Sequence, residues 1–349
     1  GIFRQSGMEL DLVLSPQEPE ADAPSAAAAA ASEPARTPVR PQHPEPPYPY
    51  VSEDVRFPSA DGSFDLAGTI TRPEGAGPFP GIVLISGSGQ QNRDEEVFGH
   101  KPFLVLADAL TRAGVAVLRY DDRGVGGSGG GEMFADATSR DFTGDAASAV
   151  SYLRKQTSVA PDEVGVLGHS EGGLIAALMA AGRGIPASAD ARPAFVVLMA
   201  AAAVPGDELL MMQSRALLEA GGASEADIDA IARVNRTVYD IVLSGTPREE
   251  AADEIARLLR ELGMNDTQIQ VQQQALLSPW FEFFLRTDPA VALRDVDVPV
   301  LAVFGTLDRQ VPSGPNAEAM ERALAAAPVA DVTIRELEGL NHLLQPATT

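Results

Sequence analysis

One serine stands in a segment whose spacing suits a nucleophile. The residues GHSEGG at 168–173 match the pattern G-x-S-x-G, with Ser170 at its centre. A buried strand is expected over 164–167 and a helix from Glu171 onward, which is the context that the pattern requires. So tight a turn strains the serine backbone and projects its hydroxyl above the sheet, while the glycines add no bulk. We therefore predict that Ser170 is a nucleophile; the alternative is a small-residue turn that happens to contain serine.

The nucleophile needs a base, because a hydroxyl is scarcely ionised at neutral pH, and the chain offers 4 histidines. His43 lies in a proline-rich stretch, His100 lies far upstream, and His169 should point elsewhere from the sharp turn. His342 follows the last expected strand, on a loop at the carboxyl edge of the sheet where Ser170 also emerges. His342 is therefore the predicted base, and an ordinary exposed loop histidine is the alternative.

The third member of such a triad is a carboxylate that orients the imidazole and stabilises its protonated form. An apolar strand expected over 300–304 is followed by Gly305, Thr306, Leu307 and Asp308, so Asp308 should reach the same sheet edge. Acidic residues are abundant, with 49 Asp and Glu in the chain. The prediction of Asp308 therefore depends on its position and not on its residue type.

Two N–H donors are needed to stabilise the oxyanion that forms when a nucleophile attacks a carbonyl. One should be the backbone N–H of Glu171, at the positive end of its helix. The other should come from the loop 87–91, after an apolar strand at 81–86, with Ser88 favoured and Gly89 second. A flexible glycine turn is the alternative, and no lysine follows to suggest a phosphate loop.

A second motif, DDRG at 121–124, follows an apolar strand expected over 115–120. The paired aspartates allow a metal site, but a structural role is favoured, in which Arg123 ties loops together through bidentate contacts. Residues 124–131 also have G-x-G-x-x-G character. They do not open the helix of a first βαβ unit, so dinucleotide binding is not expected.

Strands alternate with helices over most of the chain. Such alternation predicts an α/β fold, with a mostly parallel central sheet covered by helices on both faces. The first two strands, at 51–57 and 64–71, surround a turn and form a hairpin. The later strands are expected at 81–86, 115–120, 164–167, 194–199, 298–304 and 332–337, and helices at 101–113, 141–155 and 171–181.

The strand pattern stops between about 205 and 290. Helical patterns at 209–219, 225–243 and 248–261 are followed by an aromatic cluster, so we expect an inserted helical cap; ordinary crossover helices are the alternative. Trp280 and Phe284 would line an apolar acyl pocket, or would simply anchor the cap to the core.

The N-terminal residues differ from the rest. Residues 1–14 contain an alternating strand pattern and are interpreted as the remnant of an upstream domain. Residues 15–48 are rich in Pro, Ala and Glu and are expected to form an extended linker. The hydrolytic domain is then expected over 49–349.

Composition excludes several classes of function. The net charge of −23 argues against binding to nucleic acids or anionic membranes. The absence of cysteine excludes disulfides, Cys-based metal sites and a thiol nucleophile. No apolar run is long enough to span a bilayer. We expect neither a metal nor a cofactor; the compartment and the oligomeric state are left open.

Together these segments resemble the α/β-hydrolase superfamily, and within it the bacterial esterases related to EstD. The order Ser, Asp, His is the one expected for that fold. The resemblance implies hydrolysis of small esters with short acyl chains, no cofactor, and a triad of Ser170, Asp308 and His342. The segments that carry it are ISGSGQQNRDE (85–95), GHKPFLVLADALTRAGVAVLRYDDRGVGGS (99–128), VGVLGHSEGG (164–173), PGDELLMMQ (205–213), PWFEFFLRTDPA (279–290), PVLAVFGTLDRQVP (299–312) and GLNHLLQ (339–345).

Two departures from the family pattern are visible. Ser86-Gly87 stands where many hydrolases have His-Gly, which leaves the second oxyanion donor less defined. The chain ends at Thr349, where related proteins continue into a further helix, so that a C-terminal helix is expected to be missing. An aminopeptidase or a thioesterase would share the triad. A non-catalytic binding module is the alternative from a different class.

Overall fold

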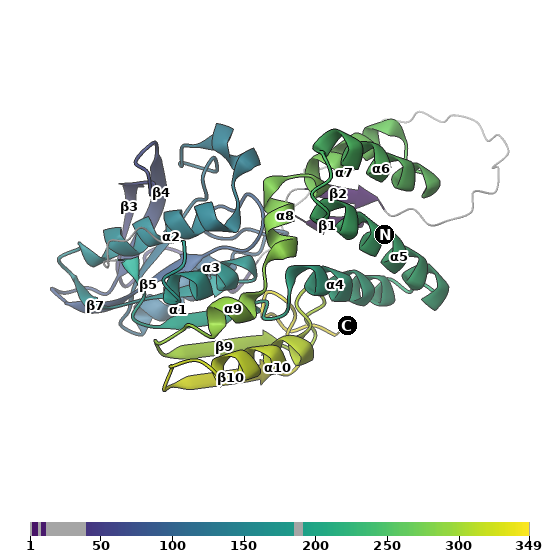
Figure 1. The fold of residues 1–349 in the computed structure, drawn as a ribbon. Coiled ribbons are helices and arrows are strands. Elements are labelled where there is room, and N and C mark those ends of the chain that lie inside the picture. The colour runs from purple at the N-terminus through teal and green to yellow at the C-terminus, as the bar shows by residue number, and fades with distance from the viewer. Residues whose placement is uncertain (1, 6–7, 12–39, 185–190, 349) are drawn as a thin grey trace, which may run out of the picture.

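The computed structural model describes residues 2–5, 8–11, 40–184 and 191–348, and its fold is shown in Figure 1. The centre is an eight-stranded sheet. Pairs β3–β4 and β4–β6 are antiparallel, and the other pairs are parallel. The expected α/β fold with a mostly parallel sheet is therefore confirmed. In spatial order the strands are β10 (Val332–Leu337), β9 (Val300–Gly305), β8 (Val196–Met199), β7 (Val159–His169), β5 (Phe79–Ile85), β6 (Ala116–Tyr120), β4 (Asp65–Arg72) and β3 (Val51–Pro58).

The central strands are apolar because both of their faces are covered. Along β5, Val83 and Ile85 face a large core under one set of helices, whereas Ile82 and Leu84 face a smaller core on the other side. All five residues of β6 are buried. Continuous apolar runs thus arise from period-2 alternation between two dry faces, which explains why these strands are recognisable from sequence.

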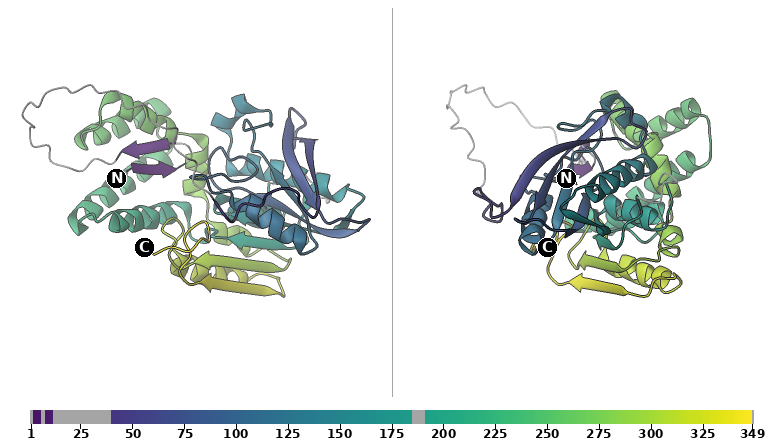
Figure 2. Two further views of the ribbon diagram at one scale, coloured as in Figure 1. Left: turned by 180° about the vertical axis from the view of Figure 1, so that it is seen from behind. Right: turned by 90° about the vertical axis from the view of Figure 1, so that its left-hand side faces the viewer.

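Helices cover the two faces unequally. The helix α1 (Pro102–Arg112) buries Phe103 and Ala107 in the smaller core. The larger core is covered by α2 (Ser139–Arg154), α3 (Glu171–Ala180), α9 (Pro289–Leu293) and α10 (Ser313–Leu324). On the α1 face, β9 leaves Leu301 38% exposed. Figures 1 and 2 show β9 and β10 at the edge of the sheet.

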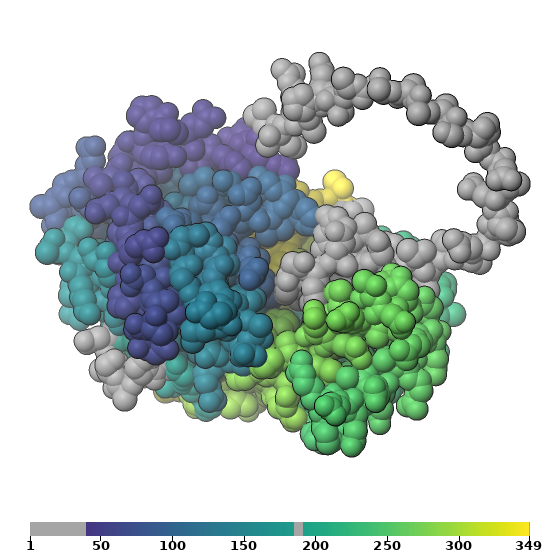
Figure 3. Space-filling view, turned by 90° about the horizontal axis from the view of Figure 1, so that it is seen from above, coloured from purple at the N-terminus to yellow at the C-terminus, as the bar shows by residue number. Residues whose placement is uncertain are grey.

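Further helices stand between β8 and α9, where the strand pattern stops. Three of them match the helical patterns of the sequence, and α7 and α8 follow. Figures 1 and 3 show α5, α6 and α7 gathered at one end of the molecule, beside the sheet domain. The helices are α4 (Gly206–Ala220), α5 (Glu225–Leu243), α6 (Arg248–Glu261), α7 (Asp266–Leu276) and α8 (Pro279–Arg286).

A separate hairpin lies at the N-terminus, where β1 (Ile2–Gln5) pairs antiparallel with β2 (Met8–Asp11). Residues 12–14 of the expected strand, and residues 15–39 of the expected linker, lie outside the described residues. The division of the chain into an upstream remnant, a linker and a hydrolytic domain with a cap stays a prediction.

Candidate active site

Ser170 sits at the junction of β7 and α3 in a conformation that side chains rarely adopt, with φ 55° and ψ −117°. Glycine is required on both sides of it. A Cβ on Gly168 would overlap the carbonyl of Gly172, and a Cβ on Gly172 would overlap the carbonyl of Ile85 on the neighbouring strand. The tight elbow therefore requires glycine at 168 and 172, because backbone atoms occupy the space that a side chain would need.

Asp308 and His342 are brought together from the ends of two adjacent strands. The imidazole Nδ1 of His342 lies 2.7 Å from Oδ2 of Asp308. The other carboxylate oxygen of Asp308 accepts the N–H groups of Gln310 and Val311 at 2.8 and 2.9 Å. Both side chains are buried. Because Nδ1 donates to a carboxylate, Nε2 of His342 is left as the proton acceptor.

The loops that carry this pair are joined to each other. The N–H of Leu307 donates to the carbonyl of Leu340 at 2.9 Å, and the N–H of Gly339 donates to the Thr306 hydroxyl at 2.9 Å. A Cβ on Gly305 would overlap the Leu340 carbonyl. The glycine at the end of β9 is therefore what lets the histidine loop approach the aspartate loop.

The histidine loop also rests on the elbow. Nε2 of His169 lies 2.9 Å from the carbonyl oxygen of His342, and the two rings are 4.6 Å apart between centroids. Among the described residues, no hydrogen bond joins the Ser170 hydroxyl to His342. Catalytic hydrogen bonds are often long in the absence of substrate and tighten in the complex. His342 is thus placed beside the residue that precedes Ser170.

The loop 87–91 passes close to the serine. A Cβ on Gly87 would lie 3.2 Å from the Cβ of Ser170. The N–H of Gly87 is already taken, because it donates to Oε1 of Glu95 at 2.7 Å. Within the described part of the chain, the N–H of Ser88 has no protein acceptor. Glu171 is the first residue of α3, so its N–H has no acceptor within the helix.

The side chain of Glu171 joins several elements around the elbow. Its Oε1 accepts the Ser139 hydroxyl at 2.6 Å and the indole N–H of Trp280 at 2.8 Å. The Ser88 side chain also bonds to it. Burial raises the pKa of the Glu171 carboxyl, although these three hydrogen bonds oppose the shift. Glu171 therefore connects α3 with the loop 87–91, α2 and α8.

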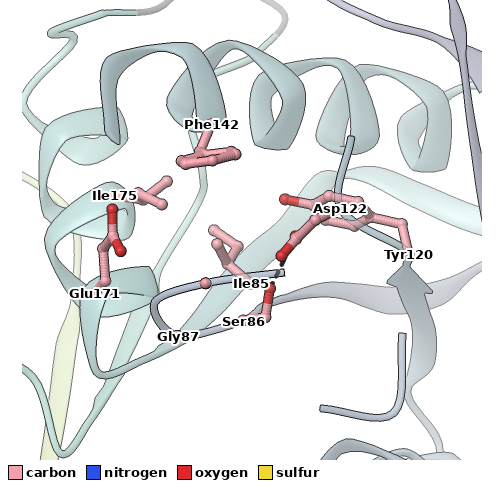
Figure 4. A pocket seen from close by; sticks show the side chains of 9 residues that line it. Ile85, Ser86, Gly87, Tyr120, Asp122, Phe142, Glu171 and Ile175 are labelled. Atoms are coloured by element: carbon pink, nitrogen blue, oxygen red, sulfur yellow. Dashed lines mark hydrogen bonds between the residues drawn. The ribbon is translucent and has the colours of Figure 1, made fainter. Parts of the chain in front are cut away.

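A small pocket opens beside the elbow (Figure 4). Asp122, which lines the pocket, accepts the Ser86 hydroxyl at 2.9 Å and the Gln91 N–H at 3.0 Å. Burial raises the pKa of Asp122 well above its usual range, despite these hydrogen bonds. The pocket is lined by Ile85, Ser86, Gly87, Gly89, Tyr120, Asp122, Phe142, Glu171 and Ile175.

Trp280 and Phe284 stack on each other, with ring centroids 5.3 Å apart. Phe284 is buried in the larger core. Trp280 reaches the pocket through its bond to Glu171, but neither aromatic ring lines the pocket itself. Their role in holding an acyl chain stays a prediction.

The motif at 121–124 is held in ion pairs. Nε of Arg123 donates to Asp145 at 2.8 Å, and its Nη2 donates to the carbonyl of Asp141 at 3.2 Å. Asp121 pairs with Arg93 at 2.8 Å. No three His, Cys, Asp or Glu side chains converge as a metal site in the part of the chain that the structure describes. The contacts of Arg123 agree with the structural role that the sequence favours.

One residue of the site lies in a segment that resembles the family (85–95), but nothing in that segment marks it as a site residue. Glu95 belongs to an acidic run, DEE at 94–96, that reads as an ordinary solvated loop. In the structure Glu95 is 1% exposed, with φ 52°, and contacts His169 at 2.8 Å. Only its long-range partners, 8 and 74 residues away, distinguish it from its neighbours.

The fold and the elbow can be compared with known proteins. Residues 82–348 match the model of the alpha/beta hydrolase family. The chain belongs to this family. It is 29% identical over 288 residues to esterase EstD of Thermotoga maritima, and the match covers 80% of this chain and 58% of EstD. The chain therefore spans less than two thirds of the length of that relative.

Solved structures share the α/β-hydrolase fold at low identity. An esterase from Pyrococcus furiosus has a TM-score of 0.52 at 15% identity, with 84% of each chain covered. A hypothetical protein from Pseudomonas aeruginosa has a TM-score of 0.54 at 16% identity, covering 86% of this chain and 89% of its own. In this α/β hydrolase, no helix of the described ranges is both long and apolar enough to cross a membrane.

Proposed function

We propose that this α/β hydrolase is a carboxylic ester hydrolase that uses Ser170, His342 and Asp308 as its triad. The observation that carries the proposal is the 2.7 Å contact between His342 and Asp308, on loops held against a strained serine elbow. A carboxylate on Nδ1 leaves Nε2 free to accept the serine proton. The relationship to an esterase supports the same chemistry.

The mechanism has two steps. Ser170 attacks the ester carbonyl while His342 takes its proton, and the N–H groups of Glu171 and Ser88, or of Gly89, hold the oxyanion. Each such donor contributes about 10²- to 10³-fold in rate. The alcohol leaves with the proton from His342. Water then hydrolyses the acyl-enzyme by the same route.

Short acyl chains suit the pocket beside the elbow. The pocket is small, and Phe142 and Ile175 give it apolar walls. An acetyl or propionyl group would contact these walls when its carbonyl lies over Ser170. We therefore place small neutral acyl esters as the preferred substrate class; thioesters of the same acyl groups would use identical machinery.

A serine aminopeptidase is the second candidate, because two carboxyl groups, Glu171 and Asp122, line the pocket. A substrate amine would need a free carboxylate. Glu171 is occupied by Ser139 and Trp280, and Asp122 by Ser86 and Gln91. The ester is favoured because it requires no cationic subsite.

The test compares turnover of p-nitrophenyl acetate with that of an aminoacyl anilide. We expect the ester to be hydrolysed, and Ser170→Ala to reduce kcat by about a million-fold, the scale of loss when a nucleophilic serine is removed. Asp308→Asn should cost about 10⁴-fold. Ser52→Ala, at an exposed position of β3, is the matched control. Ester turnover that survives in Ser170→Ala, or turnover of the anilide alone, would reject the proposal.

A further inference from the structure

A second carboxylate–imidazole pair lies behind the proposed triad. Oε1 of Glu95 is 2.8 Å from Nδ1 of His169, and both side chains are almost fully buried, at 2% and 4% exposure. His169 precedes the serine, and its ring lies 4.6 Å from the ring of His342. The triad mechanism uses neither side chain, so this pair requires its own explanation.

The pair connects two loops of the proposed site by hydrogen bonds. On one side, Glu95 accepts the N–H of Gly87, in the oxyanion loop (residues 87–91), at 2.7 Å. On the other side, Nε2 of His169 donates to the carbonyl of His342, in the histidine loop (residues 339–345), at 2.9 Å. A continuous chain of hydrogen bonds therefore runs from the oxyanion loop to the base.

Hydrogen-bond accounting fixes where the protons lie. A backbone carbonyl only accepts, so Nε2 of His169 carries a proton. Burial lowers the pKa of His169, but the charge and hydrogen bond of Glu95, with the His342 carbonyl, outweigh burial and raise it. Both ring nitrogens of His169 are therefore engaged, Nε2 with the His342 carbonyl and Nδ1 with Glu95. The titratable groups that face His169 are Glu95, His342 and Asp308.

The conformation of Glu95 is costly. Its φ of 52° lies in the left-handed region, which is unfavourable for a residue with a side chain. Its second oxygen, Oε2, is buried without a hydrogen-bond partner in the described structure. Strain and an unpaired buried oxygen are features that cluster at functional sites.

We propose that Glu95 and His169 are positioning residues that hold the oxyanion loop and the histidine loop in register across the elbow. In this arrangement the Ser88 N–H and Nε2 of His342 act at the same ester carbonyl: the first stabilises the oxyanion and the second accepts the proton of Ser170. The inference rests on the proposed hydrolysis through Ser170. It adds a second histidine, one that acts through its hydrogen bonds and never exchanges a proton with substrate.

Three variants divide the pair into its parts. Glu95→Gln removes the charge and keeps an acceptor. His169→Asn keeps a donor near the position of Nδ1, toward Glu95, but loses the donor to the His342 carbonyl. His169→Gln keeps a donor near the position of Nε2, toward that carbonyl. Asp108→Asn is the control, because it changes a carboxylate of a different pair, with Arg112 on α1.

We expect Glu95→Gln and His169→Asn to lower kcat for p-nitrophenyl acetate by about 10- to 100-fold, the scale of a 1 Å misplacement of reacting groups. KM should change less than about threefold, because neither Glu95 nor His169 is among the residues that line the pocket. His169→Gln should recover a larger part of kcat than His169→Asn. The control should retain the wild-type kcat. A merely structural role would lower the yield of folded protein and leave kcat per active site, titrated with a fluorophosphonate, unchanged.

Proton NMR of the folded enzyme gives a readout without substrate. The N–H protons of His342 toward Asp308 and of His169 toward Glu95 should both resonate well downfield of the amides. Glu95→Gln should remove only the second signal. In wild type, phosphonylation of Ser170 should shift the His169 signal, because the pair connects the two loops. This measurement needs no variant, so it tests the proposal even where a variant fails to fold.

The outcomes separate the two proposals. Turnover that does not depend on Ser170 rejects the proposed hydrolysis itself. Turnover that depends on Ser170 but is unchanged in kcat by Glu95→Gln and His169→Asn overturns the positioning role alone. A His169 signal that stays fixed on phosphonylation also overturns it. Reduced kcat at nearly constant KM, with the larger rescue in His169→Gln, supports it.

Discussion

The backbone conformation of Ser170 is what makes this residue recognisable in the sequence. Its φ of 55° and ψ of −117° are held because Gly168 and Gly172 leave room for carbonyls that a methyl group would overlap. The same need for glycine makes the elbow visible in the sequence. Residues whose function follows from a backbone constraint are therefore the ones that sequence reasoning finds first.

The other residues of the site differ in how far they are predictable. Asp308 and His342 were accessible because each follows a recognisable strand, and parallel strands end at one edge of the sheet. Glu95 was not accessible, since it follows no periodic pattern and its partners come from other parts of the chain. The hydrogen bond from the Ser139 hydroxyl to Glu171 was likewise not predictable. Contacts between side chains that are distant in the sequence are defined only by the folded structure.

Asp122 gives a prediction on pH and stability. Burial raises its pKa in the folded protein, so the folded state binds its proton more tightly than the unfolded state. The stabilising contribution of this proton is complete at low pH and is lost as pH rises above about 3.9, the ordinary aspartate value. Asp122→Asn keeps one acceptor and one donor for Gln91 and Ser86. The variant should therefore gain stability relative to wild type as pH rises, by at most about 1.4 kcal/mol per pH unit.

Urea unfolding of both proteins between pH 3 and pH 8 measures this difference. The control is Asp61→Asn, for which the expected change in stability with pH has the opposite sign, because the pKa of Asp61 is lowered. Hydrogen bonds from Ser63 and Ser59 lower the pKa of Asp61 to about 2. Its contribution is present above the unfolded pKa and is lost as pH falls toward 2. A difference for Asp122→Asn that is flat across the range would contradict the raised pKa.

At the scale of elements, continuous apolar runs and βα alternation were sufficient to predict the sheet. The helix α7 was missed because only Ile269 and Gln272 of its residues are buried, so that its apolar pattern is weak. The strand β1 was missed because its sequence, IFRQ, shows no alternation of apolar and polar residues. Elements that bury little of their own surface depend on neighbours for their stability, and the local sequence does not record those neighbours.

The contact between α8 and the elbow gives a prediction at this scale. Trp280 donates its indole N–H to the carboxyl group of Glu171, which also accepts a hydrogen bond from the Ser139 hydroxyl. Trp280→Phe keeps the stacking on Phe284 and removes that donor. We expect a loss of about 1–3 kcal/mol in the free energy of unfolding. We also expect a raised KM for p-nitrophenyl acetate, because α8 is no longer tied to the pocket wall.

Urea unfolding followed by circular dichroism and steady-state kinetics measure both effects. Circular dichroism is needed because Trp280 is the only tryptophan of the chain. Tyr239→Phe is the matched control, since Tyr239 is buried in the same group of helices and its hydroxyl bonds to no other group in the described structure. An unchanged KM in Trp280→Phe would show that the tie to Glu171 does not shape the pocket.

The whole molecule carries a net charge of −23. Three arginines around the site do not offset this charge locally, because each is paired with a carboxylate: Arg123 with Asp145, Arg93 with Asp121 and Arg119 with Asp94. An anionic substrate therefore approaches against a field that summed surface charge creates. The field reaches about 30 Å at 0.01 M salt and about 3 Å at 1 M.

This charge predicts how salt affects substrate choice. The value of kcat/KM for an anionic ester, such as the monoester of succinic acid with p-nitrophenol, should rise several-fold between 0.01 M and 1 M salt, because screening removes repulsion on approach. Turnover of neutral p-nitrophenyl acetate is the control and should change little over the same range. The ratio of the two values isolates the field from general salt effects on the enzyme. A ratio that stays constant would mean that the field of the surface charge does not reach the mouth of the site.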